Sequence, residues 1–198
     1  MEFGHYKIAP LIFLIIILYI GLNKLFDLIK SKMFKKFQPP SIIGVIGIIL
    51  FLINNYCWNW PLINPILIDC PDISGEYIGK VNIRNTNNLS KKELPTVKVE
   101  VNQTGTNLNF DLYSEKGSHS TNIVTKLIKI NNLWYVYTIY KNENTKNPDN
   151  RNKYEGVSKF EIHQKTNPDS IHLVGQFYTD DSRRTYGTIE LNKIINKN

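Results

Sequence analysis

Two apolar stretches occupy the first third of the chain, and the alternation typical of β-strands follows them. The first stretch runs from Ile8 to Phe26, and the second runs from Ser41 to about Trp58. A lipid core of roughly 30 Å needs about 20 helical residues. The first stretch has that length, whereas the strictly apolar part of the second ends at Ile53. Polar and aromatic residues follow it, as expected at a lipid–water boundary. The pattern predicts two membrane helices ahead of a soluble domain.

The first 70 residues are predicted to form a membrane domain. We expect helices at about 8–26 and 41–58, a basic linker at 27–40 and an exit segment at 59–70. In the linker, apolar residues recur every four positions and lysines fall largely elsewhere, which is typical of a helix lying on anionic headgroups. An ordinary charged loop is the alternative. No small-residue cleavage site follows the first stretch, so we expect a retained helix and not a signal peptide.

Residues 71–198 alternate between apolar and polar positions, with breaks rich in Gly, Asn, Asp and Pro that suit tight turns. The expected strands are Ile73–Arg84, Thr96–Gln103, Leu108–Ser114, Ser120–Ile130, Leu133–Lys141, Tyr154–Gln164, Ser170–Thr179 and Arg183–Lys193. Sequential strands with short turns predict an eight-stranded antiparallel up-and-down β-barrel, similar to a lipocalin, because closure removes exposed edges. A barrel of this size is either filled or just able to hold one small ligand.

Strand parity indicates which side chains face inward. The residues sharing this face are Ile73, Gly75, Tyr77, Gly79, Val81 and Ile83; Val97, Val99, Val101 and Gln103; Leu108, Phe110 and Leu112; Tyr154, Gly156, Ser158, Phe160 and Ile162; and Arg183, Thr185, Gly187, Ile189 and Leu191. The set is apolar at one end of the strands and gains Tyr, Ser, Thr, Gln and Arg toward the other. We therefore expect an apolar floor and a polar, aromatic-lined mouth.

Composition and motifs favour a binding protein over an enzyme. The net charge of +7 is spread over both parts of the chain with the two signs interspersed. This suits a small anionic ligand better than DNA or RNA, whose binding needs a concentrated basic face. Cys57 and Cys70 are the only cysteines, so no disulfide framework is expected. The four histidines lack metal-ligand spacing, and no nucleophile, phosphate-loop or dinucleotide motif occurs. No cofactor and no metal are expected.

The last predicted hairpin holds the best binding candidates. Tyr178 and Tyr186 flank the pair Arg183 and Arg184 across a tight turn. A guanidinium matches phosphate geometry, and tyrosine rings stack on nucleobases. Parity points Arg183 inward and Arg184 outward. A solvated hairpin with two surface arginines is the alternative.

Two segments carry a resemblance to a known family. They are the opening strand PDISGEYIGKV (71–81), directly after the two-helix anchor, and the closing GQFYTDDSRRTYGTIEL (175–191). Together they resemble the small two-transmembrane, β-strand-rich effectors of CBASS, the bacterial cyclic-oligonucleotide anti-phage systems, also described as CD-NTase-associated effectors with a minimal β-barrel. The SGxYxG start also looks like the first strand of lipocalin-type barrels, whose pattern carries Trp where this chain has Tyr77.

The resemblance implies a receptor. A partner CD-NTase nucleotide cyclase would make a cyclic dinucleotide after phage infection, and the barrel would bind it. The chain would then form a homo-oligomer whose helices disrupt the inner membrane, with cell death or growth arrest. As a hypothesis, Arg183 contacts a ligand phosphate and Tyr178 or Tyr186 stacks on a base, with Arg184 as a further ligand-binding candidate. Thr185 and Tyr77 would line the mouth.

Topology leaves a second interpretation open. Two spans put both termini on one side of the membrane, so a cytoplasmic barrel places the lysine-rich linker in the periplasm. The positive-inside rule prefers the reverse. The absence of cysteine after Cys70 and the resemblance favour a cytoplasmic barrel on a multi-pass inner-membrane protein. The alternative function is a membrane-tethered, lipocalin-like carrier of a hydrophobic small molecule. A third interpretation is an envelope scaffold whose barrel interior is fully packed. An enzyme is the least favoured interpretation.

Overall fold

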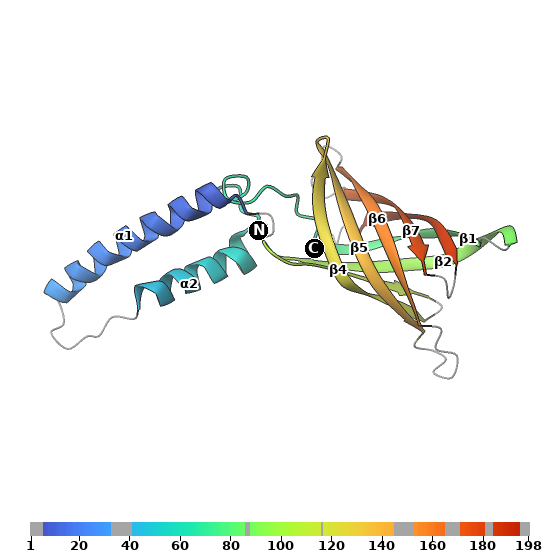
Figure 1. Cartoon of the computed structure of the whole chain (residues 1–198), viewed down its shortest axis with the longest axis horizontal. Helices are drawn as coiled ribbons and strands as arrows, with labels where there is room; N and C mark the ends of the chain where they lie inside the picture. Colours follow the sequence, from blue (N-terminus) through green and yellow to red (C-terminus); the bar gives the residue numbers. More distant parts are fainter. Residues whose placement is uncertain are drawn as a thin grey trace. The chain divides into compact units, whose positions relative to one another are not determined.

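The computed structural model describes residues 6–32, 41–85, 88–115, 117–144, 153–164, 171–180 and 184–194. The chain divides into two compact units (Figure 1). The first is Met1–Asp72 with Thr104–Asn107, and the second is Ile73–Gln103 with Leu108–Asn198.

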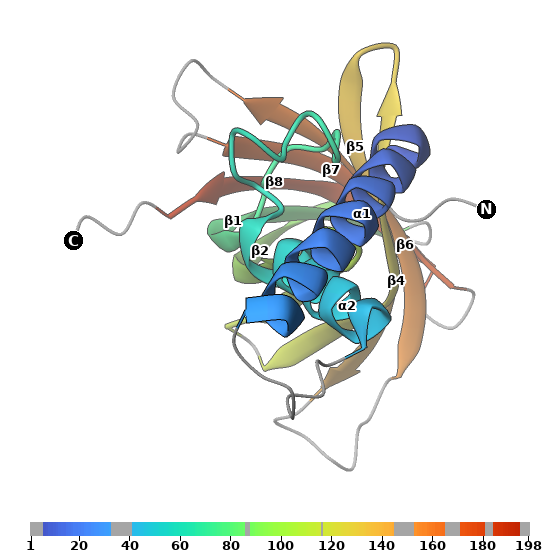
Figure 2. The same cartoon turned by 90° about the vertical axis from the view of Figure 1, so that its left-hand side faces the viewer.

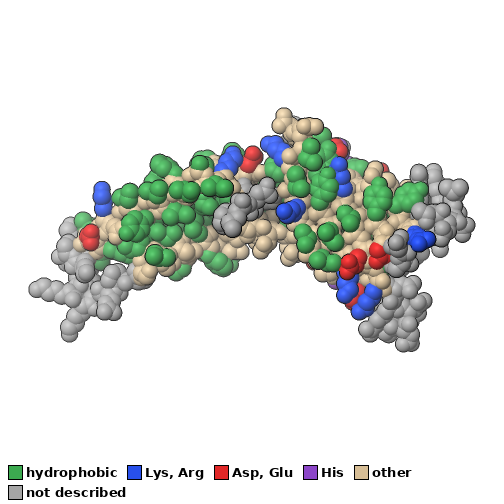
Figure 3. Space-filling model, in the orientation of Figure 1, with side chains coloured by type: hydrophobic (Ala, Val, Ile, Leu, Met, Phe, Trp, Pro, Cys, Tyr) green, Lys and Arg blue, Asp and Glu red, His purple; other side chains and the backbone are tan. Residues whose placement is uncertain are grey.

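The first unit contains one long apolar helix. Helix α1 spans Ile8–Lys32, so it continues through the beginning of the predicted linker. Its segment Ile8–Ile29 is long and apolar enough to cross a membrane, and it is the one helix of the described residues that is. Hydrophobic side chains cover most of the visible face of the two helices (Figure 3).

The second helix is shorter than predicted. Helix α2 spans Ile42–Leu52 and continues as a π-helical turn, η1, over Ile53–Cys57. Together these 16 residues extend about 24 Å, less than the roughly 30 Å of a hydrocarbon core. The side-chain amide of Asn55 donates to the Phe51 carbonyl (2.8 Å), so a polar side chain bonds the backbone near the end of this helix. The helices α1 and α2 lie side by side (Figure 2), but the expectation of two full spans is supported for the first alone.

The second unit is a closed antiparallel barrel in which each strand pairs with its neighbour in sequence and β8 pairs with β1, as predicted. The strands are β1 Gly75–Asn85, β2 Asn88–Gln103, β3 Leu108–Ser114, β4 Ser118–Ile130, β5 Leu133–Asn144, β6 Tyr154–Gln164, β7 Ile171–Thr179 and β8 Thr185–Lys193.

The first hairpin is longer than the alternation indicates. Strand β2 begins at Asn88, well before the predicted start at Thr96. Its register against β1 shifts between Lys80 and Asn82, opposite the part of β2 that contains Pro95. Proline has no N–H to donate to a ladder, so a local irregularity there is expected. The predicted turn between β4 and β5 is confirmed, since Asn131 and Asn132 both have positive φ (48° and 66°).

The inward faces match the predicted parity. Their most buried side chains include Tyr77, Val99, Val136, Phe160, Leu173 and Leu191. The rings of Phe110 and Phe160 pack with their centroids 4.9 Å apart. In three cross-strand pairs an aromatic ring lies against a glycine of the next strand: Tyr140–Gly156, Phe160–Gly175 and Phe177–Gly187. A glycine leaves room for a ring to lie along the wall of the barrel.

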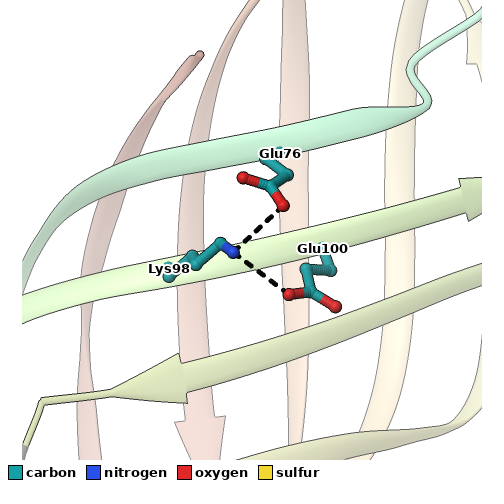
Figure 4. A network of polar contacts seen from close by, with 3 residues as sticks. All are labelled: Glu76, Lys98 and Glu100. Atoms are coloured by element: carbon teal, nitrogen blue, oxygen red, sulfur yellow. Dashed lines mark hydrogen bonds and ion pairs between the residues drawn. The ribbon is translucent and has the colours of Figure 1, made fainter. Parts of the chain in front are cut away.

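The outer face of β1 and β2 carries paired charges. The Lys98 ammonium bonds Glu76 Oε1 (3.0 Å) and Glu100 Oε1 (3.2 Å), which joins the two strands (Figure 4). Hydrogen bonds to these two carboxylates raise the pKa of Lys98. The three side chains are nearly half exposed, so the network adds little to stability.

Candidate functional site

Buried polar side chains gather at one end of the barrel interior. We call this the polar end; it is the end of the barrel at which β3, β5 and β7 finish and β4, β6 and β8 begin. The buried polar residues of the described chain are Ser120, Thr138, Asn142, Ser158 and Thr185, and none is charged. They lie toward this end on β4, β5, β6 and β8. The expectation of a polar end above an apolar floor therefore agrees with the structure.

An amide at the polar end is fully engaged. The amide nitrogen of Asn142 donates to Ser118 Oγ (2.7 Å) and Ser120 Oγ (2.6 Å), and its oxygen accepts from Ser118 Oγ (3.0 Å). Thr125 Oγ1 donates to Thr138 Oγ1 (3.0 Å) in the same way across β4 and β5. Buried polar groups are costly when unpaired, so these bonds hold the inner wall in one arrangement.

One buried hydroxyl at the polar end is not engaged. Ser158 is 4% exposed, and its side-chain hydroxyl forms no hydrogen bond within the described parts of the chain. It pairs across the ladder with Thr138 on β5 and Phe177 on β7, so it belongs to the inner wall. Close by, the Tyr140 ring lies against Gly156 on the same wall. A free hydroxyl beside an aromatic ring offers a base one hydrogen bond and one stacking surface.

Hydrogen bonds join the adjacent ends of β7 and β8 to each other and to β6. Thr179 Oγ1 accepts from the Thr185 backbone N–H (2.8 Å) and lies 3.0 Å from Thr185 Oγ1. Asp180 Oδ2 accepts from the Glu155 N–H (3.0 Å), which ties the end of β7 to β6. Arg184 has φ of 49° and donates its N–H to the Asp180 carbonyl (2.9 Å). The exposed Arg184 side chain therefore lies directly before β8, at the rim of the polar end.

The predicted ligand residues do not all lie together. Thr185 faces inward at the polar end, and Arg184 lies at its rim. Tyr178 and Tyr186 pair across β7 and β8 on the outer face, with stacked rings 6.5 Å apart. Arg183 lies outside the described residues. The ligand-binding role of these residues stays a prediction.

Tyr77 lies apart from the others, which corrects its placement at the mouth. It is 0% exposed, and its hydroxyl donates to the Ile73 carbonyl (2.7 Å). Thr185 pairs with Asn85, eight residues further along β1, or about 26 Å along the strand. The physical reason is that Tyr77 stands near the beginning of β1, among the apolar side chains of the floor.

Sequence reasoning did not assign Tyr140, Asn142 or Ser158 to the site. Ser158 was on the predicted inward face, and counting by twos from the buried Val136 brings Thr138, Tyr140 and Asn142 to the same face. That signal exists in the sequence, but it is weak until one strand residue is known to be buried. Among the described residues, no cluster of three His, Cys, Asp or Glu side chains is placed to hold a metal ion.

A closed eight-stranded barrel with uncharged polar groups at one inner end has the features of a small-ligand-binding protein. The family model for the Cap15 cyclic dinucleotide receptor domain matches residues 68–193. The chain belongs to this family. The match covers all eight strands and agrees with the expected CBASS resemblance and with a ligand-sensing domain, which is not a catalytic family. No curated protein matches the chain.

Proposed function

We propose that the polar end of the barrel binds a cyclic dinucleotide and that binding makes the chain an effector of CBASS defence. Membership of the Cap15 receptor family is the observation that supports a cyclic dinucleotide as the ligand. The proposed consequence is homo-oligomerisation and disruption of the inner membrane, followed by cell death or growth arrest. A CD-NTase nucleotide cyclase would supply the ligand.

The charge distribution supports one way of binding. A cyclic dinucleotide carries two phosphodiester charges, and the buried polar side chains of the described interior are all neutral. A buried phosphate would lack a counter-charge there, which is costly. A base would instead meet hydroxyl groups and the Tyr140 ring. We therefore propose that a base enters the polar end while the phosphates stay at the rim, near Arg184.

The two predicted ligand-binding arginines are tested by single substitution. Arg183→Ala and Arg184→Ala in the full chain are each expected to weaken cyclic dinucleotide binding by about 10- to 100-fold, since a charge-assisted bond contributes about 1.5–3 kcal/mol. Isothermal titration of the detergent-solubilised protein against cyclic di-AMP, cyclic di-GMP and cyclic GMP–AMP measures this. Lys80→Ala, on the outer face of β1, is the control. If both arginine variants bind like the parent, the rim assignment is wrong.

The location of the barrel is tested by a reporter. Alkaline phosphatase fused after Asn198 is expected to be inactive and green fluorescent protein fluorescent, because a cytosolic messenger needs a cytosolic barrel. Helix α1 supplies one span, and the proposal requires the shorter α2–η1 segment to return the chain to the cytoplasm. Phosphatase activity at this position would contradict the receptor proposal and favour the carrier interpretation.

A further inference from the structure

A row of apolar side chains crosses the outer face of five strands at one register. Its members pair in succession across β4, β5, β6, β7 and β8: Val124, Ile139, Val157, Tyr178 and Tyr186. We call these five residues the apolar row. Val157 is 48% exposed and Tyr178 57% exposed, and Val124 and Ile139 are similarly open. Contiguous exposed apolar residues are typical of interaction surfaces.

The middle of the row is bordered by opposite charges on one strand. On β6, Glu155 stands two residues before Val157 and Lys159 two residues after it, and all three face outward. The Cα atoms of Glu155 and Lys159 are thus about 13 Å apart, with that of Val157 midway between them. On β1 and β2, by contrast, the charges of Glu76, Lys98 and Glu100 satisfy one another.

Neither bordering charge has an ion-pair partner within the described chain. The cross-strand neighbour of Glu155 is Lys141, but Lys141 pairs with Glu143 (3.4 Å). Glu143 also pairs with Lys153 (3.3 Å), and these two lysines lower its pKa. The Lys159 ammonium lies over the Tyr135 ring, 4.3 Å from its centroid. An approaching surface could therefore form an ion pair with either residue without breaking one, and Lys159 would exchange its ring contact for the new pair.

From this pattern we infer that the middle of the apolar row, at Val157, packs against the same place on a second copy of the chain, about a two-fold axis that passes between the two Val157 side chains and is parallel to the row there. Such an axis places each Val157 opposite its equivalent. It also places Glu155 of each copy opposite Lys159 of the other, so two ion pairs flank an apolar centre. An interface of this kind is self-complementary and closed. Its apolar core and charged rim follow the ordinary anatomy of protein interfaces.

The charge pattern favours a second copy over a lipid surface. Anionic headgroups attract basic segments and repel carboxylates. The apolar row has an acid on one border and a base on the other, which two copies neutralise and a membrane does not. This inference deepens the proposed function, because it names the surface through which ligand-bound copies would associate.

Charge reversal tests the pairing. In the full chain in detergent, Glu155→Lys and Lys159→Glu are each expected to weaken association about tenfold, since two attractive pairs become two repulsive ones. The double variant Glu155→Lys/Lys159→Glu restores opposite charges and is expected to associate like the parent. A mixture of the two single variants is also expected to associate like the parent. Glu190→Lys, on the outer face of β8, is the matched control and should change little.

Two measurements separate the outcomes. Sedimentation equilibrium follows association with and without cyclic di-AMP, cyclic di-GMP or cyclic GMP–AMP, and isothermal titration follows binding of the same ligands. Single variants that associate like the parent overturn the apolar row as the interface. A double variant that stays weak overturns the two-fold pairing, and a parent that is monomeric under every condition overturns the inference altogether. Loss of binding in the parent would instead count against the proposed function and would show in the titration alone.

Discussion

Replacing Gly175 with alanine is expected to destabilise the barrel by about 1–3 kcal/mol, a typical cost of overpacking a core. A Cβ at Gly175 would meet the Phe160 ring and the backbone carbonyl oxygen of Lys159, the latter at 2.9 Å. The ring packs against Phe110, and the carbonyl belongs to a strand paired on both sides, so neither moves freely. The gain from a less flexible unfolded chain, about 0.4–1 kcal/mol, does not offset this.

Thermal unfolding of the full chain in detergent, followed by near-ultraviolet circular dichroism, measures the effect. A loss of this size lowers Tm by roughly 3–15 °C in a domain of this length. Gly47→Ala is the control, because a Cβ there meets nothing within 4 Å and alanine favours a helix.

A double-mutant cycle shows whether the ring is the cause. Phe160→Leu alone removes packing and should also destabilise the barrel. Combined with Gly175→Ala, it also removes the ring that the new methyl group would strike. The double variant is therefore expected to be more stable than the sum of the single effects by about 1 kcal/mol. Strict additivity would mean that the Gly175–Phe160 contact does not limit the packing.

The eight strands and their inward faces could be predicted because period-two alternation survives in each strand. The ends of the strands were harder to predict. Strand β2 runs back to Asn88 through a segment whose turn-forming residues obscure the alternation. The α-helical part of the second helix ends at Leu52, before the predicted end near residue 58, and Ile53–Cys57 form a π-helical turn.

The candidate site was harder to predict because it depends on pairing between distant strands. Asn142 reaches Ser118 and Ser120 across a hairpin whose register shifts at a bulge between Asn122 and Val124. Alternation within one strand does not reveal that shift. Tyr178 and Tyr186 are close to the arginines in sequence, and the pleat turns their side chains to the outer face.

Ser158→Phe is expected to reduce cyclic dinucleotide binding at least about 100-fold, because a ring would occupy the inner wall where a base is proposed to enter. Ser158→Ala removes only the free hydroxyl and should weaken binding about 3- to 10-fold, as expected for one neutral hydrogen bond. The graded pair separates loss of space from loss of a bond. Isothermal titration of the full chain measures both, and the unfolding transition shows whether each variant is folded.

Substitutions on the outer face provide the matched comparison. Thr188→Phe adds the same ring to the exposed face of β8 and should leave binding unchanged. Tyr178→Ala and Tyr186→Ala remove the outward tyrosines, and on the present proposal they weaken association and not ligand binding. If these tyrosine variants lost the ligand while folded Ser158→Phe kept it, the ligand would lie on the outer face beside Arg184. The two arrangements differ in whether the base meets the inner face or the outer face of the barrel, so one set of titrations decides between them.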